Sequence, residues 1–262
     1  MIGRAGPEDF PRLTTLWQTC FGDDPETVAA FWQIFGKTVQ VFCAREKKSP
    51  VSMVCALPVQ LIDAAGESHS AAYLYAVATD PSCRGRGLCG NVLAFAEDSL
   101  RKSGVSFTLL VPSEPSLFSL YRRYGYQTIS RRGCEAISPA ACEGTVQEIG
   151  PEAYCNLREL LLYDSFVSCD SDFLRYQALD DRLYRVETAQ QVFCAVCSEA
   201  SGRLTVKELL PYDASAAALL LRTSGMRQGI CRTPDGSQPY AMGKALRGGT
   251  LPENIYFGLA MD

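Results

Sequence analysis

Residues 84–90 form the part of the chain whose residue types could do chemistry. They read Arg-Gly-Arg-Gly-Leu-Cys-Gly, between an apolar run at residues 71–79 and an amphipathic run at residues 88–100. A glycine-rich turn at the start of a helix leaves unpaired N–H groups pointing at one spot, where the helix dipole adds partial positive charge. Arg84 and Arg86 add full positive charges. We therefore expect an anion there, with a diphosphate as the obvious ligand; a tight turn with two solvated arginines is the alternative.

The flanking elements place this loop between a strand and a helix. Residues 73–79 have the aromatic and β-branched character of a strand, and the turn residues 80–82 end it. Residues 88–100 place apolar side chains on one helical face, and Ser103-Gly104 ends that helix. A second strand is predicted over residues 105–111.

A second motif follows at residues 121–126, which read Tyr-Arg-Arg-Tyr-Gly-Tyr. The order of strand, glycine loop, helix, strand and this aromatic ending resembles the GCN5-related N-acetyltransferase (GNAT) family. Residues 84–89 resemble its acetyl-CoA motif, (Gln/Arg)-x-x-Gly-x-(Gly/Ala), with the small Cys89 in the last place. Residues 121–126 resemble its Tyr-x-x-x-Gly-Phe ending, with Tyr126 in place of Phe. The resemblance covers roughly residues 71–130.

This resemblance implies a site for acetyl-CoA, used as a co-substrate. The N–H groups of residues 85–89 would surround the pyrophosphate, and the backbone of residues 77–79 would pair with the pantetheine arm. A backbone N–H near Val77 would face the thioester oxygen. The expected coenzyme A ligands are therefore Val77, Ala78, Thr79, Arg84, Gly85, Arg86, Gly87, Leu88 and Cys89.

The resemblance also supplies candidates for the catalytic groups. Tyr121 corresponds to the tyrosine that protonates the sulfur of coenzyme A, and a phenol with a pKa of about 10 can donate at neutral pH. The alternative is a core tyrosine on an amphipathic helix. Two candidates for the base are Glu114, whose alternative is a solvated loop carboxylate, and Asp262, because some two-lobed relatives employ their chain end. Tyr73 and Tyr75 share one strand face and could touch the acceptor.

Composition narrows the class of protein. The chain has 262 residues, of which 47% are hydrophobic, and a net charge of −4. A negative net charge is not typical of a protein that binds nucleic acid, and it mildly favours a basic acceptor. No apolar run is long enough for a membrane span, and the first residues do not resemble a signal peptide. We therefore predict a cytoplasmic protein, in which the thiols of the twelve cysteines are reduced. We expect no metal site, because the sequence has one histidine, His69, and one Cys-x-x-Cys, at residues 194–197.

The second half of the chain partly repeats the element types of the first. Two helices (residues 10–21 and 25–35) and two strands (39–44 and 51–62) precede the central strand. After a linker at residues 138–144, the pattern predicts helices, strands and a further helix at 214–221, with strand-like segments at 239–245 and 255–261.

We therefore predict an α+β fold with a mostly antiparallel central sheet flanked by helices. The predicted domains are residues 1–136, which bind acetyl-CoA, and residues 137–262, a smaller degenerate GNAT-like lobe without a cofactor loop. This arrangement resembles the two-lobed acetyltransferases; an unrelated α+β domain is the alternative for the second half.

Three possible functions fit these features. The first is an N-acetyltransferase acting on a primary amine, in a small molecule, an antibiotic or a protein terminus. The second is a non-catalytic acyl-CoA-binding module or sensor, and another acyl transfer on the same scaffold is a third possibility. The residues identify neither the acceptor nor the oligomeric state.

Overall fold

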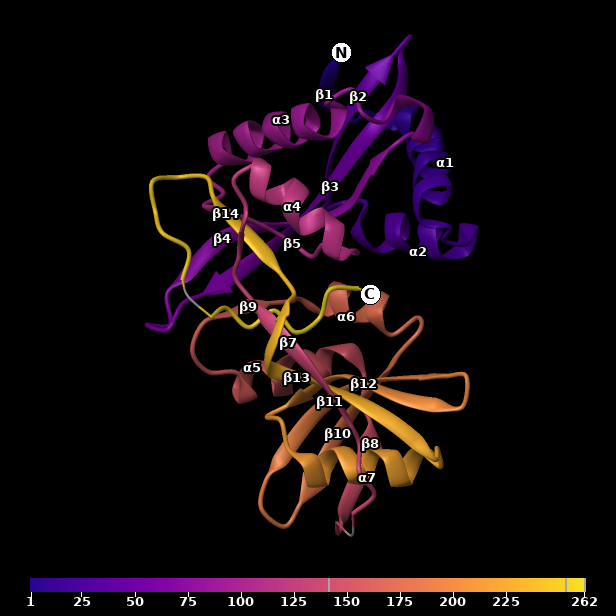
Figure 1. Cartoon of the computed structure of the whole chain (residues 1–262), viewed down its shortest axis with the longest axis vertical. Coiled ribbons are helices and arrows are strands. Elements are labelled where there is room, and N and C mark those ends of the chain that lie inside the picture. Colours follow the sequence, from indigo (N-terminus) through magenta and orange to yellow (C-terminus); the bar gives the residue numbers. More distant parts are fainter. Residues whose placement is uncertain (141, 253, 262) are drawn as a thin grey trace. The chain divides into compact units, whose positions relative to one another are not determined.

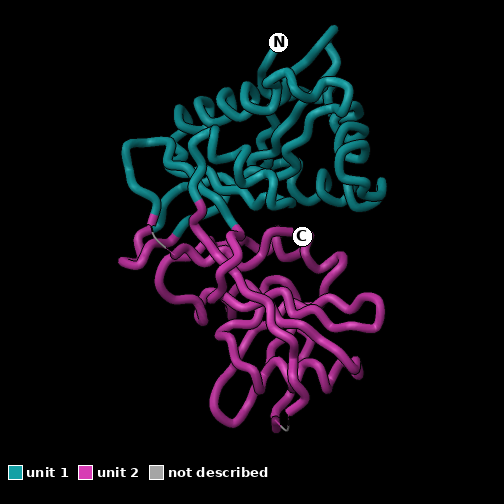
Figure 2. The backbone as a smooth tube through the Cα atoms, in the orientation of Figure 1, with its two compact units in different colours: residues 1–61, 68–127, 241–251 teal, residues 62–67, 128–240, 252–262 magenta. Residues whose placement is uncertain are grey.

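The computed structural model describes residues 1–140, 142–252 and 254–261, and divides into two compact units (Figures 1 and 2). The first comprises residues 1–61, 68–127 and 241–251; the second comprises residues 62–67, 128–240 and 252–262. Each unit contains one sheet, so the fold is mixed α+β as predicted. Among the described residues, no helix is long and apolar enough to cross a membrane.

The first unit begins with a short strand and two helices that follow their sequence signals. β1 (Ile2–Arg4) and a 3-10 turn (Pro7–Asp9) precede α1 (Phe10–Phe21), which ends at the left-handed Gly22. The side chain of Asp24 accepts hydrogen bonds from two backbone amides of α2 (Pro25–Phe35) and so caps it. Trp17 of α1 and Phe31 of α2 are buried.

The remaining elements of this unit build a seven-strand path with a helix after each of its parallel strands. They are β2 (Gln40–Glu46), β3 (Ser49–Ile62), β4 (Ser68–Thr79), a 3-10 turn (Pro81–Cys83), α3 (Leu88–Lys102), β5 (Phe107–Leu110), α4 (Pro115–Arg123) and β6 (Gln127–Thr128). The strand order is β1-β2-β3-β4-β5-β14-β6. β4 and β5 are parallel, whereas β1–β2, β2–β3 and β5–β14 are antiparallel.

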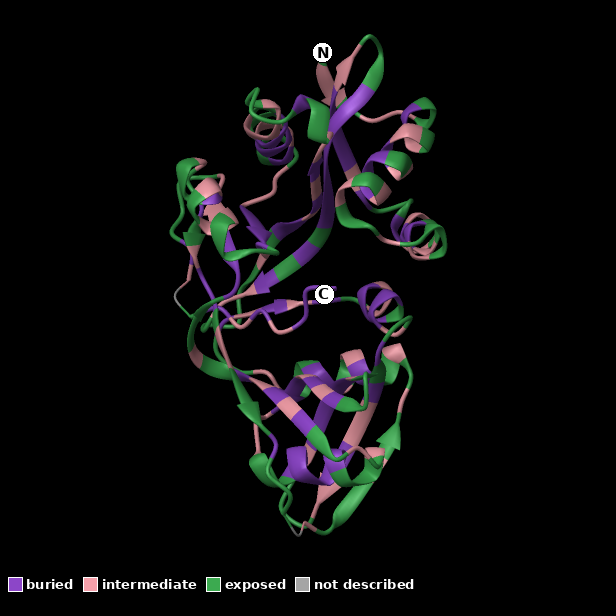
Figure 3. Cartoon of the chain, turned by 45° about the vertical axis from the view of Figure 1, so that its right-hand side comes forward, coloured by how far each residue is buried: buried purple, intermediate pink, exposed green. Residues whose placement is uncertain are grey.

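Helix α3 is held by its apolar face. Helices carry both buried and exposed residues, which Figure 3 shows as changes of colour along each ribbon. In α3 the buried apolar residues are Val92, Leu93, Ala96 and Leu100, which share a core cluster with Phe42 and other residues of the sheet. Burying one side chain of the size of leucine stabilises the fold by about 1.5–3 kcal/mol, so this stripe fixes the start of the helix relative to β4.

Strand β14 (Met242–Ala245) enters this sheet from far along the chain. It pairs with β5 from Met242 opposite Leu110 to Ala245 opposite Phe107. Lys244 donates to a carboxylate oxygen of Glu97 at 2.5 Å and to the carbonyl oxygen of Tyr124 at 2.8 Å. A strand that follows the second unit in sequence therefore completes the sheet of the first.

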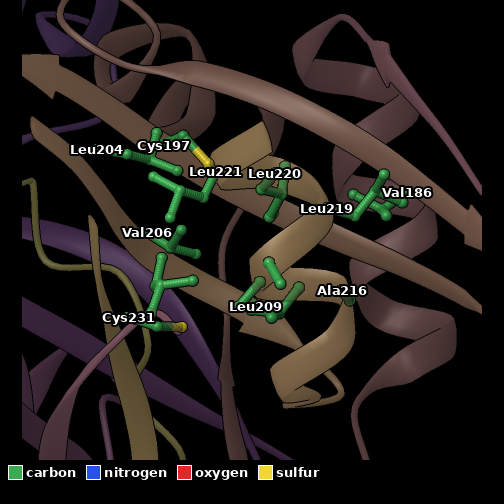
Figure 4. Packing of buried hydrophobic residues seen from close by; sticks show 14 of the residues in the cluster. Val186, Cys197, Leu204, Val206, Leu209, Ala216, Leu219, Leu220, Leu221 and Cys231 are labelled. Atoms are coloured by element: carbon green, nitrogen blue, oxygen red, sulfur yellow. The ribbon is translucent and has the colours of Figure 1, made fainter. Parts of the chain in front are cut away.

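The second unit has a six-stranded sheet in the order β7-β13-β12-β11-β10-β8. Its elements are β7 (Arg131–Ala136), β8 (Gly144–Glu148), α5 (Pro151–Leu161), β9 (Phe166–Ser168), α6 (Ser171–Gln177), β10 (Arg182–Thr188), β11 (Val192–Ala200), β12 (Arg203–Leu210), α7 (Ala214–Ser224) and β13 (Gln228–Pro239). Figure 4 shows Leu219 and Leu220 of α7 in the cluster that includes Val206 and Cys231 of the sheet.

The two units repeat one order of elements. The series β1, α1, α2, β2, β3, β4, α3, β5 has its counterpart in β8, α5, α6, β10, β11, β12, α7, β13, apart from β9, which lies between α5 and α6. β12 and β13 are parallel, as β4 and β5 are. This confirms the predicted second lobe with the same element types. Whether residues 1–136 and 137–262 fold as separate domains stays a prediction.

Near the chain end, one strand was not predicted and one predicted strand is wrong. β13 was missed because Gly229, Pro234 and Gly236 suggest turns; its ladder with β7 shifts register between Thr233 and Gln238, which accommodates them. The strand predicted over residues 255–261 is wrong, because this segment forms no strand and only Tyr256 in it makes a β-bridge, with Phe166. Of the segment predicted over 239–245, residues 242–245 form β14.

Candidate active site

The parallel strands β4 and β5 pair over a short distance and then separate. Their ladder joins Ala71–Tyr73 to Phe107–Leu109, whereas β4 continues to Thr79. Beyond Tyr73, the edge of β4 that faces β5 is not used by the ladder recorded between these two strands. Backbone polar groups on such an edge need another partner, and an extended ligand can supply it. This is the segment where residues 77–79 were expected to meet pantetheine.

A bulge in β4 changes which side chains face the core. Ala76 has a φ of +48°, in the left-handed region that non-glycine residues seldom adopt. Ala72 and Leu74 pack in the core cluster beneath α3, and so does Val77, so the alternation shifts by one residue between Leu74 and Val77. A bulge leaves a residue outside the regular ladder. The bulge could not be predicted from the residue types, because alanine is not a typical left-handed residue.

The end of β4 is anchored by hydroxyl groups. Ser52 on β3 donates to the carbonyl oxygen of Ala78 at 3.0 Å, and its hydroxyl lies 2.8 Å from that of Thr79. The amide of Asp80 donates to the carbonyl oxygen of Val51 at 2.9 Å. These bonds fix the strand at the point where the glycine loop begins.

The glycine loop is open and left-handed at two positions. Gly85 and Gly87 have φ values of +76° and +73°, and an added Cβ at either residue would have no atom within 4 Å. The Nε atom of Arg84 donates to the carbonyl oxygen of Thr79 at 3.2 Å, which ties the loop back to β4. The loop therefore combines the conformation that requires glycine with free space around it.

The first turn of α3 has no side-chain cap. Its N-cap residue is Gly87, and the first helical bond recorded runs from the amide of Asn91 to the carbonyl oxygen of Gly87 at 3.1 Å. The amides of residues 88–90 precede that bond and have no helical carbonyl to bind. Three donors and the positive end of the helix dipole thus occur next to the open loop.

Both arginines of the loop, which were expected to bind phosphate, also have partners within the protein. Arg84 holds the loop, as described above. Arg86 forms a double contact with the carboxylate of Glu46 on β2, and this contact raises the pKa of Arg86. Both partners are partly exposed, so an anionic ligand must compete with Glu46 for this side chain.

Tyr121 lies where the loop and α4 meet. Its side chain is 6% exposed and packs edge-on against Tyr126, with ring centroids 5.9 Å apart. Burial raises the pKa of Tyr121, and interaction with the thiol of Cys89 raises it further, so its hydroxyl is protonated at neutral pH. Burial likewise raises the pKa of Cys89 to about 11, which keeps that thiol neutral. Tyr121, the first residue of the second motif, therefore lies close to Cys89, the last residue of the acetyl-CoA motif.

The structure does not place either candidate for the base in a buried environment like that of Tyr121. Glu114 is exposed at the N-cap position of α4 and accepts a hydrogen bond from the hydroxyl of Ser116 at 3.2 Å. Asp262 lies outside the described residues. The rings of Tyr73 and Tyr75 lie 5.8 Å apart, and Tyr75 contacts Trp17 and Phe31, so these tyrosines face the α1–α2 side of the sheet.

A comparison with known protein families matches the first half of the chain. A family profile described as "Acetyltransferase (GNAT) domain" matches residues 2–129. No curated protein matches the sequence.

Solved structures resemble nearly the whole chain at low sequence identity. A conserved Enterococcus faecalis V583 protein of unknown function is similar with a TM-score of 0.77 and 18% identity, over 94% of this chain and 72% of that one. Eis1 from Mycobacterium abscessus gives 0.70 and 13%, over 94% and 74%. A tandem GNAT protein from the clavulanic acid biosynthesis pathway gives 0.59 and 11%, over 95% and 99%. Residues 2–129 are therefore a GNAT acetyltransferase domain, and a second lobe follows it in the chain.

Proposed function

We propose that this protein is an acetyl-CoA-dependent N-acetyltransferase that transfers an acetyl group to a primary amine by direct attack. The observation that carries the proposal is the open loop at residues 84–87, next to the uncapped first turn of α3 and the separating end of β4. A diphosphate and an extended pantetheine arm are the ligand parts that match these two features. Tyr121 adds a protonated hydroxyl at the same place.

In this proposal the cofactor is bound mainly by backbone groups. The amides of residues 85–89 surround the pyrophosphate, with Arg84 and Arg86 beside it, and residues 77–79 pair with the pantetheine arm. The bulge at Ala76 supports an amide near Val77 as the donor to the thioester oxygen, because it takes this part of β4 out of regular pairing. Such a donor stabilises the negative charge that develops on the oxygen.

The chemical step exchanges one bond to the acetyl carbon for another. A neutral amine attacks the thioester carbon, the C–N bond forms, and the C–S bond breaks with its electron pair remaining on sulfur. Tyr121 donates its proton to the leaving thiolate. Because the pKa of Tyr121 is raised, its phenolate is costly, so the tyrosine regains a proton from solvent, while the attacking nitrogen, which becomes positively charged when the C–N bond forms, loses one to give the neutral amide.

The partner in this reaction is a small-molecule amine or a protein amine, and we propose that it is encountered in the cytoplasm. All twelve cysteines have free thiols, which suits a reducing compartment. We propose no nucleic acid, membrane or metal as a partner. Glu114 and Asp262 remain candidates for the base.

Thiol release from acetyl-CoA tests the proposal. The protein is incubated with acetyl-CoA and a panel of primary amines, and free coenzyme A is followed with a thiol reagent. We expect amine-dependent release. Coenzyme A binding without release with any amine would instead favour the acyl-CoA sensor.

Tyr121→Phe tests the role of the acid. We expect kcat to fall about 100-fold, the size typical of losing a general acid, while the Kd for coenzyme A changes little. An unchanged kcat would remove Tyr121 from the mechanism.

A further inference from the structure

Tyr124, three residues after Tyr121, lies directly on the first turn of α3. A Cβ added to Gly90 would be 2.6 Å from the Cε1 atom of Tyr124 and 2.9 Å from its hydroxyl oxygen. No side chain fits in that space, so the ring lies against the bare backbone of Gly90. The side chain is half-buried and packs against the core cluster under α3.

The position of Tyr124 is fixed from two directions. Its amide donates to the carbonyl oxygen of Tyr121 at 2.9 Å, which ends α4. Its own carbonyl oxygen accepts from Lys244 at 2.8 Å, and Lys244 is in turn paired with Glu97. The ring is therefore held over α3 by α4 and by β14, rather than placed by a mobile loop.

The hydroxyl of Tyr124 faces one of the amides that precede the first helical bond of α3. The Gly90 amide interacts with this hydroxyl as a donor, whereas burial raises the pKa of Tyr124, so the hydroxyl is protonated at neutral pH. A tyrosine hydroxyl accepts and donates at the same time. Its proton is thus available to a group that binds beside the amides of residues 88–90.

We propose that Tyr124 is a ligand of the cofactor's diphosphate, a role distinct from that of Tyr121. This inference rests on the proposed function. When a diphosphate binds the loop amides up to Cys89, the hydroxyl of Tyr124 accepts from the Gly90 amide and donates a hydrogen bond to one of the diphosphate oxygens. A hydrogen bond to a charged oxygen is stronger than one between neutral groups, so the hydroxyl contributes to affinity rather than to the chemical step.

The test compares three tyrosines of one motif, each changed to phenylalanine. Kd values for coenzyme A and for dephospho-coenzyme A are measured by isothermal titration calorimetry, and folding is checked by thermal unfolding. Tyr124→Phe keeps the ring on Gly90 and removes the hydroxyl. We expect its Kd for both ligands to rise about tenfold, as for the loss of one hydrogen bond to a charged group.

Tyr126→Phe is the matched control. The hydroxyl of Tyr126 donates to Glu97 at 2.8 Å and lies 3.1 Å from that of Thr108, both inside the core. This variant is expected to lower the melting temperature and to leave both Kd values unchanged. Tyr121→Phe is expected to lower kcat alone, so each tyrosine has its own signature.

The outcomes separate the two proposals. Tight binding by the unmodified protein together with an unchanged Kd for Tyr124→Phe would overturn this inference and leave the proposed function standing. A loss seen with coenzyme A but not with dephospho-coenzyme A would assign the hydroxyl to the 3′-phosphate and overturn the diphosphate assignment. Failure of the unmodified protein to bind coenzyme A would overturn both.

Discussion

The two lobes share an order of elements but differ at the helix that follows the first of the two parallel strands. In the first lobe, α3 starts at the left-handed Gly87, without a side-chain cap. In the second, Asp213 precedes α7 and its carboxylate accepts from the amide of Ala216 at 2.8 Å. The second helix therefore carries its own anion at its N-terminus, which is where a phosphate would otherwise bind.

The strands that precede these two helices also differ, because only the one in the second lobe carries a buried carboxylate near its end. β12 pairs with β13 over Arg203–Val206 and then carries Glu208, which is 1% exposed. Its carboxylate accepts hydrogen bonds from Arg158, Tyr154 and Tyr256. In the first lobe, the corresponding end of β4 has a backbone bulge at Ala76 instead. The same fold can therefore leave the backbone amides at a helix start open to a ligand, as in the first lobe. Alternatively, its own carboxylates can occupy the corresponding positions, as in the second lobe.

The largest effect should come from breaking the buried pair in the second lobe. Arg158 is 2% exposed and lies 3.0 Å from Glu208. Arg158→Leu leaves a buried carboxylate without its charge partner, which costs about 3–5 kcal/mol of unfolding free energy. Urea denaturation followed by circular dichroism measures this loss. The double variant Arg158→Leu/Glu208→Leu should recover part of it, and no recovery would contradict the ion-pair explanation.

The next effect separates the glycine of the cofactor loop from a glycine of the same conformation in the second lobe. Gly87→Glu places a negative charge and a side chain where the diphosphate would lie, so the Kd for coenzyme A should rise more than about 100-fold. Calorimetry with coenzyme A checks this expectation.

Gly225→Glu is the matched control for that variant. Gly225 has a φ of +70° at the end of α7, and an added Cβ there would also have no atom within 4 Å. Both variants introduce the same backbone strain and the same charge. Equal losses of affinity would show that strain, rather than the loop, explains the effect.

A smaller effect is expected from removing the cap of α7. Asp213→Ala should lower the unfolding free energy by about 1 kcal/mol, the usual value for an N-cap carboxylate, without creating a second coenzyme A site. Thermal unfolding and the stoichiometry of coenzyme A binding are the two measurements. A stoichiometry of two would show that Asp213 alone blocks the second lobe.

The smallest effect concerns the contact between Arg86 and Glu46. Glu46→Gln removes the carboxylate that competes for Arg86, so the Kd for coenzyme A should fall by a few-fold. Since both side chains are partly exposed, added salt should reduce the difference between variant and unmodified protein. A weaker affinity in the variant would mean that Glu46 supports the site instead.

Local signals in the sequence predicted much of the first lobe. The ends of α1 and α2 follow from Gly22 and Asp24, whose conformation and hydrogen bonds involve residues a few positions away. The loop at residues 84–87 and Tyr121 were likewise identified from short motifs. The seating of Tyr124 on Gly90 was missed, although a glycine directly after Cys89 in the first turn of a helix was a usable signal.

Long-range pairing was not predictable in the same way. Neither the insertion of β14 beside β5 nor the contact of Lys244 with Glu97 has a local signature, because each joins residues more than 100 positions apart. The unpredicted strand β13 tolerates turn residues because its partner β7 follows it through a register shift. Which edge a strand joins depends on the edges that the rest of the chain leaves unpaired.

The sequence by itself determined where an anion could bind, because glycine conformation and helix amides are properties of neighbouring residues. Only the tertiary structure decided whether that capacity lies in a usable setting, beside an open loop and the separating end of a strand. Bulges, buried ion pairs and the seating of one ring on a glycine arise from contacts between elements, and such contacts depend on packing that no short stretch of residues encodes.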